Sequence, residues 1–157
     1  MGVVGYYFIL LLRPDSRPHR ESKPLTQIVE EVRVEVVDTR KDIADLIRAA
    51  EVYANQGEID DLIYAQRQVS DAVFNAKELG IVSSREGEGY KREQQNLYKT
   101  GFEQALGKET EEARKYARQK NVLEMNKHLD LMRDYADKLN KDISALCTQI
   151  EASAKRR

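Results

Sequence analysis

The apolar residues of this chain recur at alternating steps of three and four over most of its length. The first such stripe consists of Val29, Val32, Val36, Thr39, Ile43, Leu46, Ala50 and Tyr53. This spacing places the apolar side chains on one side of a helix and matches the heptad of a coiled coil. It predicts a helix from Thr26, which can cap its start, to Gln56, followed by Gly57 in the left-handed conformation.

A second structure is open for the beginning of this segment. Val32, Val34 and Val36 also alternate with a period of two, which is typical of a strand. Thr39 with Asp42 resembles a capping box, which would restart the helix there. The uninterrupted three-and-four spacing favours the continuous helix.

A second stripe predicts a helix that follows the first after a very short link. It consists of Ile59, Leu62, Gln66, Val69, Val73 and Ala76, and it stops at Gly80. Because little more than Gly57 separates the two helices, they must be adjacent and antiparallel. Residues 81–89 contain two glycines and two serines and predict a loop, although Ser83 with Glu86 could already begin the next helix.

The third predicted helix has the least regular stripe. Its stripe consists of Tyr98, Phe102, Ala105, Ala113 and Tyr116, with the polar Glu109 among them. Gly101 and Gly107 lie within the same predicted helix. Glycine has a low helix propensity, so we expect a bend or a break near Gly107.

The last stripe is the most regular one in the chain. It consists of Val122, Met125, Leu129, Met132, Ala136, Leu139, Ile143, Leu146 and Ile150. It predicts one long helix, capped by Asn121 with Glu124, after a tight turn at Lys120 and Asn121. Leu139 lies in the middle of this stripe, so we expect Leu139→Asp to be among the most damaging single substitutions.

These four segments predict an all-α fold. The arrangement that they favour is an antiparallel four-helix bundle made of two long helical hairpins over residues 26–157. The stretch from Tyr53 to Ile59, with Gly57, resembles the helix-turn-helix of a tetratricopeptide repeat, a protein-binding unit of about 34 residues. Stripes of 20 to 30 residues in the other segments do not suit repeats of that length, so no function is transferred from that family.

Residues 1–25 form a separate segment. Its first twelve residues are nearly all apolar, and a polar run with three prolines follows them. An apolar stretch of this length falls short of the roughly 20 residues that span a bilayer, and it lacks the basic start of a signal peptide. Three structures stay open for residues 3–12: a strand, a helix packed on the main body, or a membrane contact with nearby arginines at the headgroups.

Composition and charge narrow the possible partners. The chain has 26 Lys and Arg against 27 Asp and Glu, a formal net charge of -1. That balance lacks the basic field of a nucleic-acid-binding protein, so we expect no nucleic acid partner. The single cysteine, Cys147, cannot form an internal disulfide, which is typical of a reducing compartment and indicates the cytoplasm.

Few residues offer catalytic or metal-binding chemistry. The only histidines are His19 and His128. Glu124 and His128 are four residues apart on one helix face and could present two metal ligands, but many exposed faces carry such pairs. We therefore assign no catalytic, metal or cofactor residue and expect no small-molecule substrate. The polar stripe residues Gln66 and Glu109 lie at similar heights above the hairpin turns and could meet in one layer.

Helix lengths suggest where a partner binds. The first and last stripes span about 36 and 42 Å, whereas the second spans about 26 Å. Val29, Val32, Ile143 and Ile150 would then project beyond the second helix as an uncovered apolar strip, which usually marks an interface. The leading hypothesis is a non-enzymatic scaffold that binds another protein or forms a homodimer. The alternatives are a membrane-associated sensor or adaptor anchored through residues 1–25, and a metal-binding or enzymatic bundle.

Overall fold

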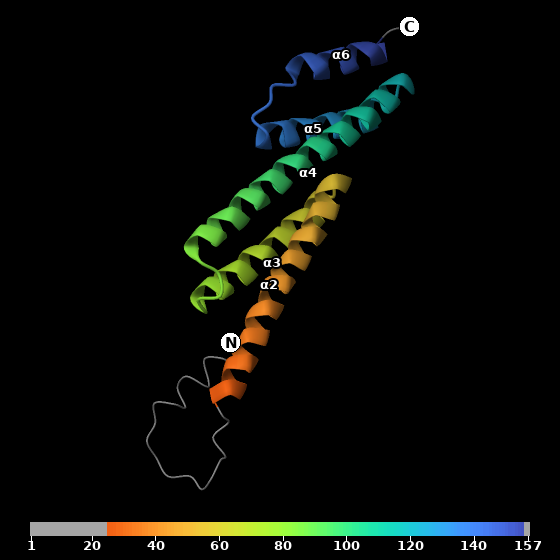
Figure 1. Cartoon of the computed structure of the whole chain (residues 1–157). Helices are drawn as coiled ribbons and strands as arrows, with labels where there is room; N and C mark the ends of the chain where they lie inside the picture. The colour runs from red at the N-terminus through yellow and green to blue at the C-terminus, as the bar shows by residue number, and fades with distance from the viewer. Residues whose placement is uncertain (1–24, 156–157) are drawn as a thin grey trace, which may run out of the picture. The chain divides into compact units, whose positions relative to one another are not determined.

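The computed structural model describes residues 25–155, and helices are the only regular elements in that range (Figure 1). The predicted all-α class is confirmed. Atomic contacts divide the chain into Met1–Glu35 and Val36–Arg157, a division that falls inside the first described helix. The predicted apolar N-terminal segment lies outside the described residues. The helices are α2 (Leu25–Gln56), α3 (Ile59–Glu78), α4 (Ser84–Arg118), α5 (Val122–Lys138) and α6 (Ser144–Lys155).

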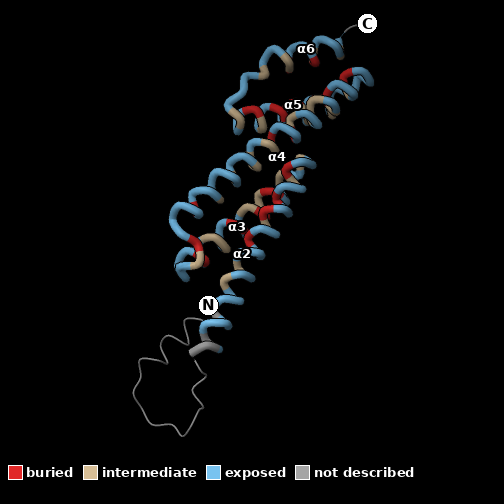
Figure 2. The backbone as a smooth tube through the Cα atoms, viewed as in Figure 1, coloured by how far each residue is buried: buried red, intermediate tan, exposed pale blue. Residues whose placement is uncertain are grey.

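Helix α2 is continuous, as the three-and-four spacing predicted, and the alternative strand is wrong. It already includes Leu25, so it begins one residue before the predicted cap at Thr26. It ends at Gln56, where Gly57 takes the left-handed conformation with a φ of 64°. Ile43 is the first of its described side chains to be buried (Figure 2).

The second half of α2 packs against α3 through two small apolar clusters. One joins Ile43 and Ile47 to Val69, Ala76 and Val82, and the other joins Ala50 and Ala54 to Leu62 and Ala65. Both clusters are completed by the beginning of α4, where the half-buried Leu97 packs against each of them. The predicted stripes of these helices therefore supply the core from position 43 onward.

Helix α4 begins inside the predicted loop at residues 81–89, at the alternative start that Ser83 with Glu86 indicated. Ser83 accepts a hydrogen bond from the backbone N–H of Glu86, and the Glu86 carboxylate accepts one from the backbone N–H of Ser83. This capping box starts the helix at Ser84, so the glycines at 87 and 89 are helical. The expected break near Gly107 is also absent, because α4 continues to Arg118.

Two glycines allow close contact between α4 and the α2–α3 pair. A Cβ atom at Gly57 would lie 2.8 Å from the backbone nitrogen of Ala105. A Cβ atom at Gly101 would overlap the Cδ2 methyl of Leu62 and lie 3.5 Å from the Cα of Ala54. Only glycine fits at these two places without a shift of the neighbouring atoms.

The four-helix bundle of two long hairpins is not confirmed. A third cluster, separate from the two along α2, is formed by the second half of α4 with α5 and α6 (Figure 1). Its buried members are Ala113, Ala117, Met125, Leu129, Met132, Cys147 and Ile150. The described helices of residues 36–155 thus form two cores along one long helix, rather than one core surrounded by four helices.

The last predicted helix is also wrong as a single element, because it is interrupted between Lys138 and Ser144. Asn140 has a φ of 52°, a left-handed conformation that asparagine tolerates better than most residues. After it, the Asp142 carboxylate accepts hydrogen bonds from the backbone N–H and the hydroxyl of Ser144 and starts α6. The break lets α6 fold back so that Cys147 and Ile150 join the same cluster as Leu129.

Candidate functional site

The strongest polar contact between two helices joins α4 to α5. Nδ1 of His128 lies 2.5 Å from Oε2 of Glu109, and each side chain is about one-fifth exposed. Both residues were singled out from the sequence, but for other partners. Glu109 was expected to meet Gln66, and His128 was considered together with Glu124.

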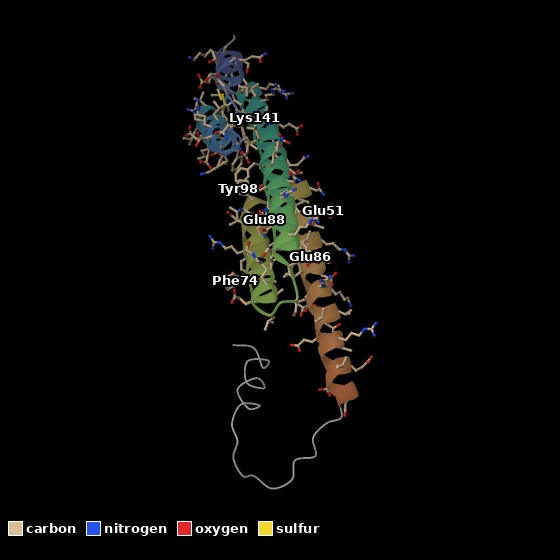
Figure 3. All side chains as sticks on the ribbon, turned by 60° about the vertical axis from the view of Figure 1, so that its left-hand side comes forward. Glu51, Phe74, Glu86, Glu88, Tyr98 and Lys141 are labelled. Carbon is tan, nitrogen blue, oxygen red and sulfur yellow. The ribbon has the colours of Figure 1, made fainter. Side chains whose placement is uncertain are left out.

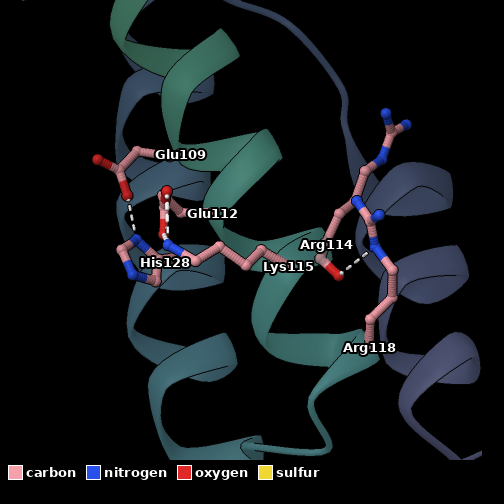
Figure 4. A network of polar contacts seen from close by, with 6 residues as sticks. All are labelled: Glu109, Glu112, Arg114, Lys115, Arg118 and His128. Atoms are coloured by element: carbon pink, nitrogen blue, oxygen red, sulfur yellow. Dashed lines mark hydrogen bonds and ion pairs between the residues drawn. The ribbon is translucent and has the colours of Figure 1, made fainter.

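A stacked aromatic ring and an ion pair lie beside this contact, and Figure 4 shows the ion pair of Lys115 and Glu112 together with Glu109 and His128. The rings of Tyr116 and His128 are stacked, with centroids 5.3 Å apart and planes 10° from parallel. The ammonium of Lys115 lies 5.3 Å from the centre of the Tyr116 ring and 2.8 Å from Oε2 of Glu112. The hydrogen bond that its ammonium donates to Glu112 raises the pKa of Lys115. The imidazole is therefore held on one edge by a carboxylate and on one face by an aromatic ring.

This arrangement fixes the imidazole but offers it no further reactive group. A carboxylate on Nδ1 directs Nε2 outward, as in many histidines that bind a metal or transfer a proton. No group of three His, Cys, Asp or Glu side chains that could hold a metal ion lies within the described residues. Glu124, the predicted companion of His128, instead pairs with Lys127 at 2.6 Å. The contact is best explained as a link between α4 and α5.

The only cysteine of the chain is buried. Cys147 is 4% exposed and packs in the cluster formed by α4, α5 and α6. Thiols in such surroundings behave as small apolar groups. The ring of Tyr135 touches that of Phe102 edge-on, and burial raises the pKa of Tyr135.

Gln66 has a partner that the sequence did not suggest. Its amide donates to the backbone oxygen of Gln94 at 2.8 Å, and the amide of Gln94 donates back to the backbone oxygen of Gln66 at 3.0 Å. The prediction that Gln66 meets Glu109 is therefore wrong. The sequence did contain a signal for Gln94. The three-and-four spacing of α4 extends back from Leu97 through position 94 to Tyr90, so Gln94 is a polar residue on the apolar side of the helix.

An open groove of about 450 Å³ lies beside this amide pair, between α3 and α4. Its lining is mixed and consists of Ile63, Gln66, Arg67, Ser70, Asp71, Gln94 and Tyr98. Phe74, farther along α3, is 63% exposed and lies at the outer side of that helix (Figure 3). The groove is open, and three of its polar residues, Gln66, Ser70 and Gln94, are already hydrogen-bonded to one another.

The four predicted interface residues have different surroundings. Val29 is 63% exposed, whereas the side chain of Val32 lies outside the described residues. Ile143 is half-buried against the cluster of α4, α5 and α6, and Ile150 within it is only 2% exposed. Ile143 and Ile150 do not contribute to an exposed strip, because the break after Lys138 turns them toward the core of α4, α5 and α6.

Comparison with known proteins identifies no relative of this chain. No family model matches the chain, and neither the curated proteins nor the solved structures include a match. None of the described helices is long and apolar enough to cross a membrane.

Proposed function

We propose that this protein is a non-enzymatic interaction module that associates with other helices through the first part of α2. The observation that carries the proposal is the change in burial along the α2 stripe. Its apolar spacing begins at Val29, but its described side chains are buried only from Ile43 onward. Of the described stripe side chains between residues 29 and 42, a length of about 21 Å, Val29 is exposed and Val36 and Thr39 are half-buried.

Three valines in the first part of α2 are largely exposed to solvent. Val29, Val34 and Val37 are 63%, 54% and 59% exposed. Single exposed apolar residues are common, so only the valine that belongs to the heptad stripe supports the proposed interface. Val29 belongs to the heptad stripe, whereas Val34 lies on the opposite side of the helix.

The chemistry of the described residues supports the same proposal. The thiol is inside a core, and the imidazole of His128 is engaged in a link between two helices. In the groove beside α3, Gln66 and Gln94 are hydrogen-bonded to each other. Helices that present an apolar face to a partner helix are a common basis of scaffolds and oligomers. We propose the cytoplasm as its compartment.

The test compares two valines of similar exposure on the same helix. Val29→Glu places a charge in the stripe, and Val34→Glu places it on the opposite side. We expect the unmodified full chain to show a mass above the 18.1 kDa of a single copy by light scattering at micromolar concentrations. Val29→Glu should lower that mass, and Val34→Glu should leave it unchanged. Equal effects of both substitutions would contradict binding through the stripe.

A further inference from the structure

We infer that the outer side of α3 binds the same side of a second copy of this chain, with the two α3 helices antiparallel. The inference goes beyond the proposed function, because it concerns a different helix and does not need the α2 stripe. Its evidence is a second regular stripe on α3, on the side away from the core. We call this set the α3 outer stripe, and it consists of Asp60, Tyr64, Arg67, Asp71, Phe74 and Glu78.

All six side chains of the α3 outer stripe are exposed. They follow one another at steps of four and three, which places them on one side of the helix. Tyr64 and Phe74 are each 63% exposed, and Phe74 lies at the outer side of α3 (Figure 3). Arg67 and Asp71 have no hydrogen bond or ion pair within the described residues, so both charges are available to a partner.

The order of residues in the α3 outer stripe is symmetric about position 69. Arg67 and Asp71 lie two residues from this centre on either side, and Tyr64 and Phe74 lie five residues from it. When two identical helices meet antiparallel about such a centre, each residue faces its counterpart from the other side. Arg67 then faces Asp71 of the second copy, and Tyr64 faces Phe74 of the second copy. Each contact occurs twice.

The charges distinguish the two possible orientations. In a parallel pair in register, every residue meets its own copy, so arginine lies beside arginine and carboxylate beside carboxylate. Like charges at an interface disfavour the pairing, whereas the antiparallel pair replaces them with two ion pairs. Two aromatic pairs flank these ion pairs, and aromatic and arginine side chains are enriched at protein interfaces. The pattern therefore selects the antiparallel homodimer.

The side chain of Phe74 from the second copy packs beside Tyr64. In helix pairs with this spacing, a side chain enters a hole formed by four residues of the facing helix. At this level the hole is formed by Asp60, Ile63, Tyr64 and Arg67. Ile63 is half-buried and lines the open groove between α3 and α4, so the incoming ring covers the exposed part of Ile63.

The contact is short. Tyr64 and Phe74 are about 15 Å apart along the helix axis. Beyond them Asp60 lies opposite Glu78 of the second copy, and these two carboxylates disfavour a longer pairing. We therefore expect a dimer that dissociates on dilution, and more readily at high salt, because salt screens exposed charges.

Charge reversal in the full chain tests the pairing. Every variant also carries Val29→Glu, so that association through α2 does not contribute, and light scattering gives the mass over a range of concentrations. We expect this starting protein to approach twice the 18.1 kDa of a single copy as its concentration rises. Arg67→Asp places a carboxylate opposite each Asp71 and should raise the dissociation constant by roughly ten-fold or more.

A double variant tests the orientation. Arg67→Asp combined with Asp71→Arg restores both ion pairs in an antiparallel homodimer, whereas a parallel homodimer keeps like charges together. We expect the double variant to return the dissociation constant to within about three-fold of that of the starting protein. The matched control is Arg92→Asp. Arg92 is exposed on α4, two residues from Gln94 and therefore on the other side of that helix, and its reversal should not change the dissociation constant.

The outcomes separate this inference from the proposed function. A double variant as weak as Arg67→Asp overturns the antiparallel pairing, and so does an equal loss from Arg92→Asp. A monomeric mass of the starting protein at all concentrations overturns the inference but not the proposed function, which is tested on the chain with Val29 intact. If the unmodified chain loses mass with Arg67→Asp and not with Val29→Glu, only the proposed function is overturned. Helix content by circular dichroism verifies that each variant is folded.

Discussion

Two leucines show how position within a stripe decides the effect of a substitution. Leu129 and Leu139 occupy equivalent positions in the most regular stripe of the sequence, but Leu129 is fully buried in the cluster of α4, α5 and α6. Leu139 is only half-buried and lies at the C-terminal cap of α5. The expectation that Leu139→Asp is among the most damaging substitutions is therefore corrected in favour of Leu129.

Leu129→Asp should destabilise the fold by several kcal/mol, because it leaves an unpaired charge in the core. Leu139→Asp should cost clearly less, since its carboxylate can reach water from the end of the helix. Leu123→Asp, at a position that is 69% exposed, should change the free energy of unfolding by less than about 0.5 kcal/mol. Urea unfolding of the three variants measures the order, and an equal loss for Leu129→Asp and Leu139→Asp would contradict it.

Polar residues inside the stripes could be recognised from the sequence, but not their partners. Gln66 and Glu109 were correctly identified as exceptions, and each does contact a neighbouring helix. Their heights above the predicted turns assumed one bundle with a common core. Because the two cores lie one after the other along α4, Gln66 meets Gln94 in the first part of that helix and Glu109 meets His128 beside its second part.

At the scale of the elements, short-range signals at helix ends were more reliable than composition. The Asn121 cap is confirmed, because its side chain accepts from the backbone N–H of Glu124 at 3.3 Å. Gly57 and Gly80 take the predicted left-handed conformations. The loop at residues 81–89 was wrong because a capping box outweighs two later glycines. The break at Asn140 was missed because asparagine gives a weaker stop signal than glycine.

The capping box makes the start of α4 sensitive to acid. Its hydrogen bond from the backbone N–H of Ser83 is the main reason that the pKa of Glu86 is lowered from 4.5. A lowered pKa in the folded state means that the ionised carboxylate stabilises the fold above the ordinary value, and that this contribution is lost as the pH falls through the lowered value.

We therefore expect Glu86→Gln to be less stable than the parent at pH 7, with a difference that shrinks as the pH falls below about 4. The change should be small, because Glu86 is exposed. Thermal unfolding of both proteins from pH 7 to pH 3 measures it. Glu88→Gln, two residues farther along the same helix, is the matched control, and a constant difference at all pH values would contradict the role of the Glu86 charge.

At the scale of the whole molecule, the sequence predicted the helical class and most helix positions but not the number of cores. Periodicity identifies which side of a helix is apolar, and it does not say which other helix covers that side. Helix α4 contributes to both cores. Its residues Tyr90 and Leu97 pack with α2 and α3, whereas Leu106 and Tyr116 pack with α5 and α6. Both sets belong to one continuous helix, so the sequence contains no boundary between them.

The two cores should open independently, and Cys147 provides the measurement. Ile150→Ala removes a buried side chain next to the thiol, whereas Ile43→Ala removes one from the other core. Substitutions of this kind cost about 2 to 5 kcal/mol. We expect Ile150→Ala to accelerate labelling of Cys147 by a soluble disulfide reagent at least ten-fold, and Ile43→Ala to change the rate much less. Equal acceleration would mean that the described helices open as one unit.

The close contacts at Gly57 and Gly101 also limit how such a sequence can change over time. A larger residue at 57 meets backbone atoms of Ala105, which cannot move aside, so substitution there requires the helices to separate. A larger residue at 101 meets the end of the Leu62 side chain, which a smaller residue at 62 would relieve. In related proteins that share this packing, position 57 is therefore expected to remain glycine, whereas positions 62 and 101 are expected to vary together, one gaining volume as the other loses it.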